Sequence, residues 1–192
     1  MTERSSGPLV LASRSPQRRA ILEQLGIAFE VVHADVDELG DGVPHEVARH
    51  NALAKAHAGA LARPGRDVLG VDTIVVCDGD VIGKPPSPAA AEAVLKRLSG
   101  RTHEVVSGLA LLRSGNPQVV HEVTKVTFRE LDDRLVQRYV QTGEWSGRAG
   151  GYAIQGQGAG LVRRIVGDYL NVVGLPVAKL LDLDLSLMLR EN

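Results

Sequence analysis

The sequence has little of several residue types, and each scarcity excludes a class of protein. Only one of its 192 residues is a cysteine, so an internal disulfide is excluded, and Cys77 in the apolar run 74–77 is expected to pack in a core. Aromatic residues make up 3% of the chain, which argues against a surface that stacks single-stranded nucleic acid. The formal net charge is −1, so the charge balance indicates neither a nucleic-acid nor a membrane partner.

Long hydrophobic runs and metal-binding spacings are also missing. No apolar stretch approaches the ~18 residues of a membrane span, and residues 1–7 are polar, without the pattern of a signal peptide. The six histidines show no zinc-site spacing. The remaining composition, with 44% hydrophobic and 23% charged residues, is ordinary for a globular protein. We therefore expect one reduced, cytoplasmic domain over residues 1–192, without a transition metal.

Apolar runs alternate with helical patterns along the chain. Strands are expected at 9–12, 29–32, 68–77, 81–82, 102–113, 118–128 and 161–166. Helices are expected at 16–25, 44–63, 88–99 and 131–142 and from residue 176, with a glycine-rich loop at 144–160. These elements predict a mixed α/β fold, with a twisted, partly antiparallel sheet flanked by helices.

The most informative segment is the junction of the first strand and the first helix, residues 9–19. Ser15 is a good N-cap, and Pro16 suits the first helical position, where a missing N–H costs nothing. The unpaired N–H groups of the helix start, the hydroxyls of Ser13 and Ser15 and the guanidinium of Arg18 would make a natural anion site. An ordinary capped helix with solvated arginines has the same pattern, so the junction alone leaves both interpretations open.

Four further polar residues stand out against their neighbours. Asp72 interrupts the apolar run 68–77, and a buried carboxylate must be paired, bound to a metal or functional. Lys84 lies on a turn after a short strand, and Lys55 lies among alanines of a long helix, although both settings are also typical of exposed lysines. Glycines around Gln155 allow a ligand to approach closely, and its amide offers a donor and an acceptor.

An acidic cluster follows the second expected strand. It consists of Asp35, Asp37 and Glu38. Such clusters are usually solvated, but together with a substrate phosphate they can hold a hard cation. The sequence alone leaves both roles open.

Short segments that contain polar residues or glycine are distributed over nearly the whole chain. They are Leu11-Ala12-Ser13-x-Ser15-Pro16-x-Arg18, Val36-Asp37-Glu38, Lys55-Ala56, Val71-Asp72-Thr73, Gly83-Lys84-Pro85, Leu98-Ser99-Gly100-Arg101-Thr102-His103, Ala149-Gly150-Gly151-Tyr152-x-Ile154-Gln155-Gly156, Gly167-Asp168-Tyr169 and Val172-Val173-Gly174-Leu175-Pro176. In order and spacing these segments resemble the Maf family of nucleoside-triphosphate pyrophosphatases. The resemblance implies two lobes with a central cleft, a fold similar to that of inosine-triphosphate pyrophosphatases, and commonly a homodimer.

The resemblance also implies a reaction. Maf proteins hydrolyse a nucleoside triphosphate between the α- and β-phosphates with Mg²⁺ or Mn²⁺, giving a nucleoside monophosphate and pyrophosphate. The family's proton acceptor matches Asp72, and such a carboxylate can deprotonate a water or hold the metal that does so. Asp72 and Glu38 are the candidate metal ligands, and Glu38 is also a candidate for substrate binding. The residues expected to bind the triphosphate are Ser13, Arg18, Lys55 and Lys84.

Three positions bear on the choice of base. Family members that act on dTTP and UTP typically carry Arg, Thr and Gln there, and those that act on 7-methyl-GTP carry Trp, Gln and Glu. The equivalent residues here are Gln17, Thr73 and Gln155. Two of the three match the pyrimidine set, so we expect a preference for dTTP and UTP, with Gln17 lacking the charge of the usual arginine. The expected role is the removal of unwanted nucleotides, modified pyrimidine nucleotides among them, from the nucleotide pool.

Two other functions stay open at this point. The inosine/xanthosine-triphosphate pyrophosphatases resemble this chain in fold and in their N-terminal phosphate strand. They place a lysine where this chain has Pro16-Gln17-Arg18, however, and lack the Gly-Tyr-x-Ile-Gln segment. The second alternative is a non-catalytic nucleotide-binding regulator of cell division, against which the presence of Asp72 beside two candidate lysines argues. In each case the expected partner is a nucleotide, with no nucleic acid and no membrane.

Overall fold

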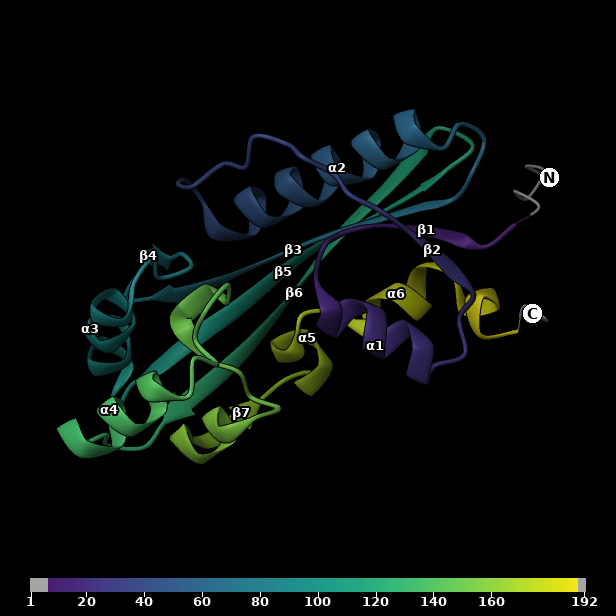
Figure 1. The fold of residues 1–192 in the computed structure, drawn as a ribbon. Coiled ribbons are helices and arrows are strands. Elements are labelled where there is room, and N and C mark those ends of the chain that lie inside the picture. The colour runs from purple at the N-terminus through teal and green to yellow at the C-terminus, as the bar shows by residue number, and fades with distance from the viewer. Residues whose placement is uncertain (1–6, 190–192) are drawn as a thin grey trace. The chain divides into compact units, whose positions relative to one another are not determined.

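The computed structural model describes residues 7–189 (Figure 1). Residues 1–6, where the sequence predicts no signal peptide, lie outside the described part of the chain. The described chain divides into two compact units, in agreement with the two expected lobes. The first unit runs to Asp72, includes Ser107–Glu122 and resumes at Gly174; the second consists of Thr73–Val106 and Val123–Val173.

Seven strands of the described chain form one mixed sheet. They are β1 (Leu9–Ala12), β2 (Phe29–Val32), β3 (Val68–Cys77), β4 (Asp80–Ile82), β5 (Thr102–Arg113), β6 (Asn116–Phe128) and β7 (Val162–Val166). The order is β2-β1-β3-β5-β6-β7, with β4 paired to β3. β1 runs parallel to β2 and β3, whereas β4 is antiparallel to β3 and β7 to β6. The predicted mixed, partly antiparallel sheet is confirmed.

Three helices begin at side-chain caps that the sequence displays. Ser15 caps α1 (Pro16–Gln24) by accepting from the N–H of Arg18 at 3.4 Å. Ser87 caps α3 (Pro88–Leu98) in the same way, accepting from Ala90 at 3.2 Å. Asp132 caps α4 (Asp133–Gln141), which therefore begins two residues later than the apolar pattern suggests. Each cap satisfies an N–H that the helix cannot pair internally.

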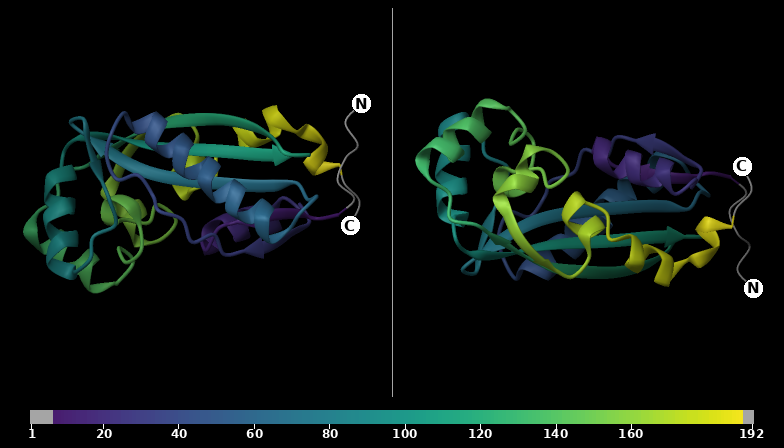
Figure 2. Two further views of the ribbon diagram at one scale, coloured as in Figure 1. Left: turned by 90° about the horizontal axis from the view of Figure 1, so that it is seen from above. Right: turned by 90° about the horizontal axis from the view of Figure 1, so that it is seen from below.

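Small residues let helix α2 (Pro44–Ala62) lie directly on the sheet of the first unit (Figures 1 and 2). A Cβ on Gly70 of β3 would overlap the backbone oxygen of Ala52, and a Cβ on Gly108 of β5 would meet the backbone of the same helix. Glycine inside a strand typically marks such close backbone approach. The helix is thereby brought within hydrogen-bonding reach of Asp72, two residues beyond Gly70 on β3.

The second unit has its own apolar core, to which β3, β5, β6, α3 and α4 contribute. Cys77 is 1% exposed in this core, as predicted. Phe128 and Tyr152 pack edge to face with centroids 4.9 Å apart, and His103 packs against both rings. Because aromatic edges and faces carry opposite partial charge, this arrangement stabilises the core beyond simple burial.

The C-terminal third departs most from the expectations. The predicted loop 144–160 contains 3₁₀ turns at Ala149–Gly151 and Gln157–Leu161, and the following strand starts at Val162. Three short elements complete the described chain: α5 (Tyr169–Val173), α6 (Val177–Leu183) and a 3₁₀ turn. α5 was not predicted, because five residues are too few for a helical periodicity to show. No helix among residues 7–189 is long and apolar enough to cross a membrane.

Candidate active site

The strand-to-helix junction of the first unit contains a buried guanidinium. Arg18 is only 8% exposed; its Nε donates to the carbonyl of Gly174 at 2.8 Å, and its Nη1 donates to Ser13 Oγ at 2.9 Å. Ser13 Oγ also accepts from the N–H of Ser15 at 3.2 Å. The predicted phosphate-binding pair, Ser13 and Arg18, is therefore in direct contact at the start of α1. A fixed positive charge beside a helix N-terminus is an arrangement that suits an anion.

An ion triad lies in the same unit. Lys55 Nζ donates to Asp72 Oδ1 at 2.7 Å and pairs with Glu38 Oε1 at 2.8 Å. Asp72 is 6% exposed and Lys55 8%, so the interpretation of Lys55 as an ordinary surface lysine is wrong. The structure thus brings together three of the predicted residues, one each from a strand, a helix and a loop.

The electrostatics of the triad keep Asp72 ionised. Burial on its own raises the pKa of Asp72, but the charge of Lys55, hydrogen bonds from Lys55 and Asn51 and the charge of Arg18 outweigh it, so the pKa lies below its ordinary value. For Arg18, burial lowers the pKa, and the charges of Asp72 and Glu38 oppose that effect. The carboxylate is therefore available at neutral pH as a proton acceptor or a cation ligand.

Asn51 is a site residue that sequence reasoning missed. It is 1% exposed, and its Nδ2 donates to Asp72 Oδ2 at 3.0 Å. The same side chain pairs with both backbone groups of Leu39: Nδ2 donates to the carbonyl at 3.1 Å, and Oδ1 accepts from the N–H at 2.8 Å. Asn51 thus ties the loop that carries Glu38 to Asp72. Its position one helical turn before Lys55 was the only local signal.

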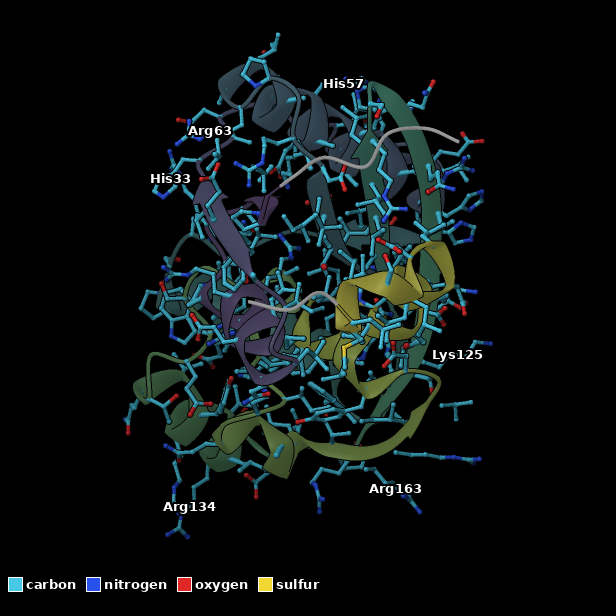
Figure 3. The ribbon with its side chains drawn as sticks, turned by 90° about the vertical axis from the view of Figure 1, so that its right-hand side faces the viewer. His33, His57, Arg63, Lys125, Arg134 and Arg163 are labelled. Carbon is cyan, nitrogen blue, oxygen red and sulfur yellow. The ribbon has the colours of Figure 1, made fainter. Side chains whose placement is uncertain are left out.

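The carboxylates of Asp72 and Glu38 both lie within 3 Å of one ammonium nitrogen. Mg²⁺ is commonly bound by one or two carboxylates together with substrate phosphates and waters, and this pair could supply the protein ligands once Lys55 moves aside. Among residues 7–189, the structure contains no group of three or more His, Cys, Asp or Glu side chains that could hold a metal ion. His33 and His57 lie on the outside of the first unit (Figure 3). Asp35 pairs instead with Arg14 at 2.6 Å.

Lys84 and Gln155, in the second unit, are presented by backbone turns. Lys84 is exposed after β4, and the carbonyl of its neighbour Gly83 accepts from the N–H of Gly150 at 3.2 Å. Gln155 is exposed on a turn that the N–H of Gly156 closes by donating to the Ala153 carbonyl at 3.2 Å. The lysine turn and the glycine-rich loop are therefore hydrogen-bonded to each other.

The other two candidate specificity residues are less exposed. Thr73 is half-buried on β3, in the second unit. Gln17 is half-buried in the first turn of α1, where its Oε1 accepts from Ser15 Oγ at 3.1 Å. Gln17 is thus held beside the capping hydroxyl of the predicted phosphate-binding junction.

Comparison with known proteins decides the family. The family model described as "Maf-like protein" matches residues 8–185. The chain belongs to the Maf family. Relatives of this Maf protein include dTTP/UTP pyrophosphatases of Symbiobacterium thermophilum (50% identity over 88% of either chain) and Moorella thermoacetica (49%, over 91% of this chain and 92% of the relative). A third, from a Geobacter species, is 48% identical over 91% of this chain and 92% of its own.

Proposed function

We propose that this protein is a nucleoside-triphosphate pyrophosphatase that cleaves between the α- and β-phosphates and prefers dTTP and UTP. The observation that carries the proposal is the buried Asp72, which is ionised and held by Lys55 and Asn51 beside a buried arginine. The names of relatives that match almost the whole chain support the same reaction and the same substrates. They do not favour an inosine/xanthosine-type activity or a non-catalytic regulator.

In the proposed reaction, Asp72 accepts a proton from the water that attacks the α-phosphorus. The new bond joins the water oxygen to that phosphorus, the bond to the bridging oxygen breaks, and pyrophosphate leaves with the bonding electron pair. Ser13, Arg18, Lys55 and Lys84 bind the phosphates and offset the charge that develops on their oxygens. A bound Mg²⁺ or Mn²⁺, held by Asp72 and Glu38, would supply further charge neutralisation.

Base selection is assigned to Gln17, Thr73 and Gln155. The amide of Gln155 can donate to a base carbonyl and accept from the imide N–H, a pattern that uracil and thymine share and cytosine lacks. We assign both units to one functional domain and, by family resemblance, expect a homodimer. Light scattering at several concentrations measures the oligomeric state, and a monomer throughout would contradict the dimer.

A nucleotide panel tests the function. Pyrophosphate release is measured with Mg²⁺ or Mn²⁺ for dTTP, UTP, CTP, ITP, XTP and 7-methyl-GTP, and kcat/KM is expected to be highest for dTTP and UTP. Faster turnover of 7-methyl-GTP would overturn the base assignment, and faster turnover of ITP and XTP would favour the rival pyrophosphatase class. Tight nucleotide binding without any turnover would favour a regulator.

A further inference from the structure

The turn that carries Gln155 is anchored by side chains at the end of α4 and just beyond it. Tyr139 of α4 is 2% exposed, and its hydroxyl accepts from the N–H of Ala153 at 2.9 Å. The carboxylate of Glu144 accepts from two successive backbone N–H groups, those of Gln157 at 3.0 Å and Gly158 at 3.3 Å. Gln155 therefore lies midway between two anchor points, each two residues away.

Two glycines show how closely the anchors fit the turn. A Cβ on Gly156 would overlap the carboxylate of Glu144, and a Cβ on Gly158 would overlap the carbonyl of Ala153. Neither glycine has a positive φ, so close approach, and not a left-handed conformation, requires them. The segment 153–158 consequently packs directly against Glu144.

A carboxylate that accepts from two neighbouring N–H groups restrains the chain at two successive residues, and a hydrogen bond to an ionised acceptor is stronger than one between neutral groups. Gln155 itself is exposed, so its side chain is free of core packing that would fix it. The backbone of the turn sets the position of its Cα atom and the direction of its Cα–Cβ bond. A ligand that binds Gln155 therefore does not pay the entropy cost of ordering the turn, because the turn is already ordered.

We propose that Glu144 is a positioning residue for base selection, which holds the backbone of the turn 153–158 so that Gln155 is presented from one fixed position. Tyr139 provides the second anchor, at Ala153. The inference rests on the proposed function for the identity of the base. It adds a residue that does not touch the nucleotide and acts through Gln155.

The test is a double-mutant cycle in which the measured quantity is the ratio of kcat/KM for UTP to kcat/KM for CTP. These two nucleotides are chosen because their bases present opposite patterns of hydrogen-bond donors and acceptors. Glu144→Gln keeps the size of the side chain but can accept from only one of the two N–H groups. We expect it to lower the ratio about tenfold, the same loss that we expect of Gln155→Ala. The double variant should lower the ratio no further than Gln155→Ala alone, because both changes remove the same discrimination.

Asp132→Ala is the matched control. It removes the N-cap of α4, a hydrogen bond of 2.7 Å to the N–H of Leu135, and so destabilises the same helix without touching the turn. Its melting temperature should fall at least as far as that of Glu144→Gln, with the UTP/CTP ratio unchanged. A purely structural role for Glu144 predicts that both variants leave the ratio intact, and that result would overturn the proposal.

Binding and hydrogen exchange separate the proposal from the proposed function. If the wild type binds nucleotide without turnover, the function fails, and the ratio of the UTP and CTP dissociation constants from calorimetry replaces kcat/KM in the same cycle. Amide exchange at Gln157 and Gly158 should accelerate in Glu144→Gln and not in Asp132→Ala. Equal wild-type affinity for UTP and CTP, additive losses in the cycle or unchanged exchange at both amides would each refute the positioning role.

Discussion

The two units differ in how they hold the charged and amide side chains of the candidate site. In the first unit, the charges of Arg18, Lys55 and Asp72 are buried and paired with one another or with Ser13, Asn51 and a backbone carbonyl. In the second unit, Lys84 and Gln155 are exposed, and their positions come from backbone turns held by N–H and carbonyl contacts. Burial without partners is costly, so the first arrangement needs contributions from several elements.

The contrast assigns different tasks to the two arrangements. Buried charges in a fixed geometry interact strongly, because water does not screen them, and suit the stabilisation of a reacting phosphate. Exposed groups on restrained turns lose water only when a ligand covers them, and they discriminate between similar ligands through the hydrogen bonds that the wrong ligand leaves unmade. Changes in the first unit should therefore reduce the rate for all nucleotides, whereas changes at the turns should alter the ranking of nucleotides.

The largest expected effect is that of Asp72→Asn. It keeps the shape of the side chain and removes the proton acceptor, so kcat for dTTP should fall about a thousandfold. Asp67→Asn is the control, because Asp67 is a buried carboxylate of the same unit that lies near Arg113 instead. Pyrophosphate release at saturating dTTP and Mg²⁺ measures the rates. Comparable activity in Asp72→Asn and the wild type would remove Asp72 from the mechanism.

The second prediction concerns stability, and it contrasts His103 in the core of the second unit with Asp72 in the first. Burial lowers the pKa of His103 from 6.5 to about 4, and its Nδ1 is buried without a hydrogen-bond partner among the described residues. Below pH 6.5 the unfolded chain therefore binds a proton that the folded one does not. Stability should fall as the pH is lowered from 6.5 to about 4, by about 3 kcal/mol in total.

Urea denaturation at several pH values measures this loss, and His103→Gln is expected to reduce the slope over that window. The pKa of Asp72 is lowered too, but a lowered carboxylate pKa stabilises the folded protein at every pH above the pKa of the unfolded chain. Its contribution is lost only below about pH 4, as the pH falls toward its folded pKa. A slope between pH 6.5 and 4 that is the same in His103→Gln and the wild type would refute the assignment to His103.

The third prediction concerns Asn51→Leu, which replaces the amide by an apolar group of similar size. It removes one of the two hydrogen-bonded supports of Asp72 and both contacts to Leu39, so kcat should fall roughly tenfold to thirtyfold. KM for dTTP should change little, because Asn51 is not assigned to substrate binding. Thr124→Val is the control, since Thr124 is a fully buried hydrogen-bonding residue of the second unit. An equal fall in kcat in both variants would indicate general destabilisation.

Much of the fold and part of the candidate site can be predicted from the sequence. The features of the site that could not be predicted all depend on contacts between residues far apart in the chain. Apolar runs gave the bounds of β1, β2, β3 and β5, and Ser-Pro pairs gave the starts of α1 and α3, because these signals are local. The roles of Asn51 and Gly174 depend on partners 12 and 156 residues away. No periodicity reports such contacts. The same holds for Glu144, whose partners appear only when the turn closes against α4.

The smallest expected effect is that of Gln17→Arg, which introduces the arginine that the family resemblance leads us to expect at this position. Gln17 lies in the first unit but is half-buried and is not part of the ion triad, so it tests whether selection is confined to the exposed turns. We expect kcat/KM for dTTP and UTP to rise about threefold at low salt, with a smaller gain at high salt. Gln17→Lys adds the charge without the planar fork of the guanidinium and should give less. An equal gain for dTTP and 7-methyl-GTP would mean that position 17 only attracts phosphate and does not select the base.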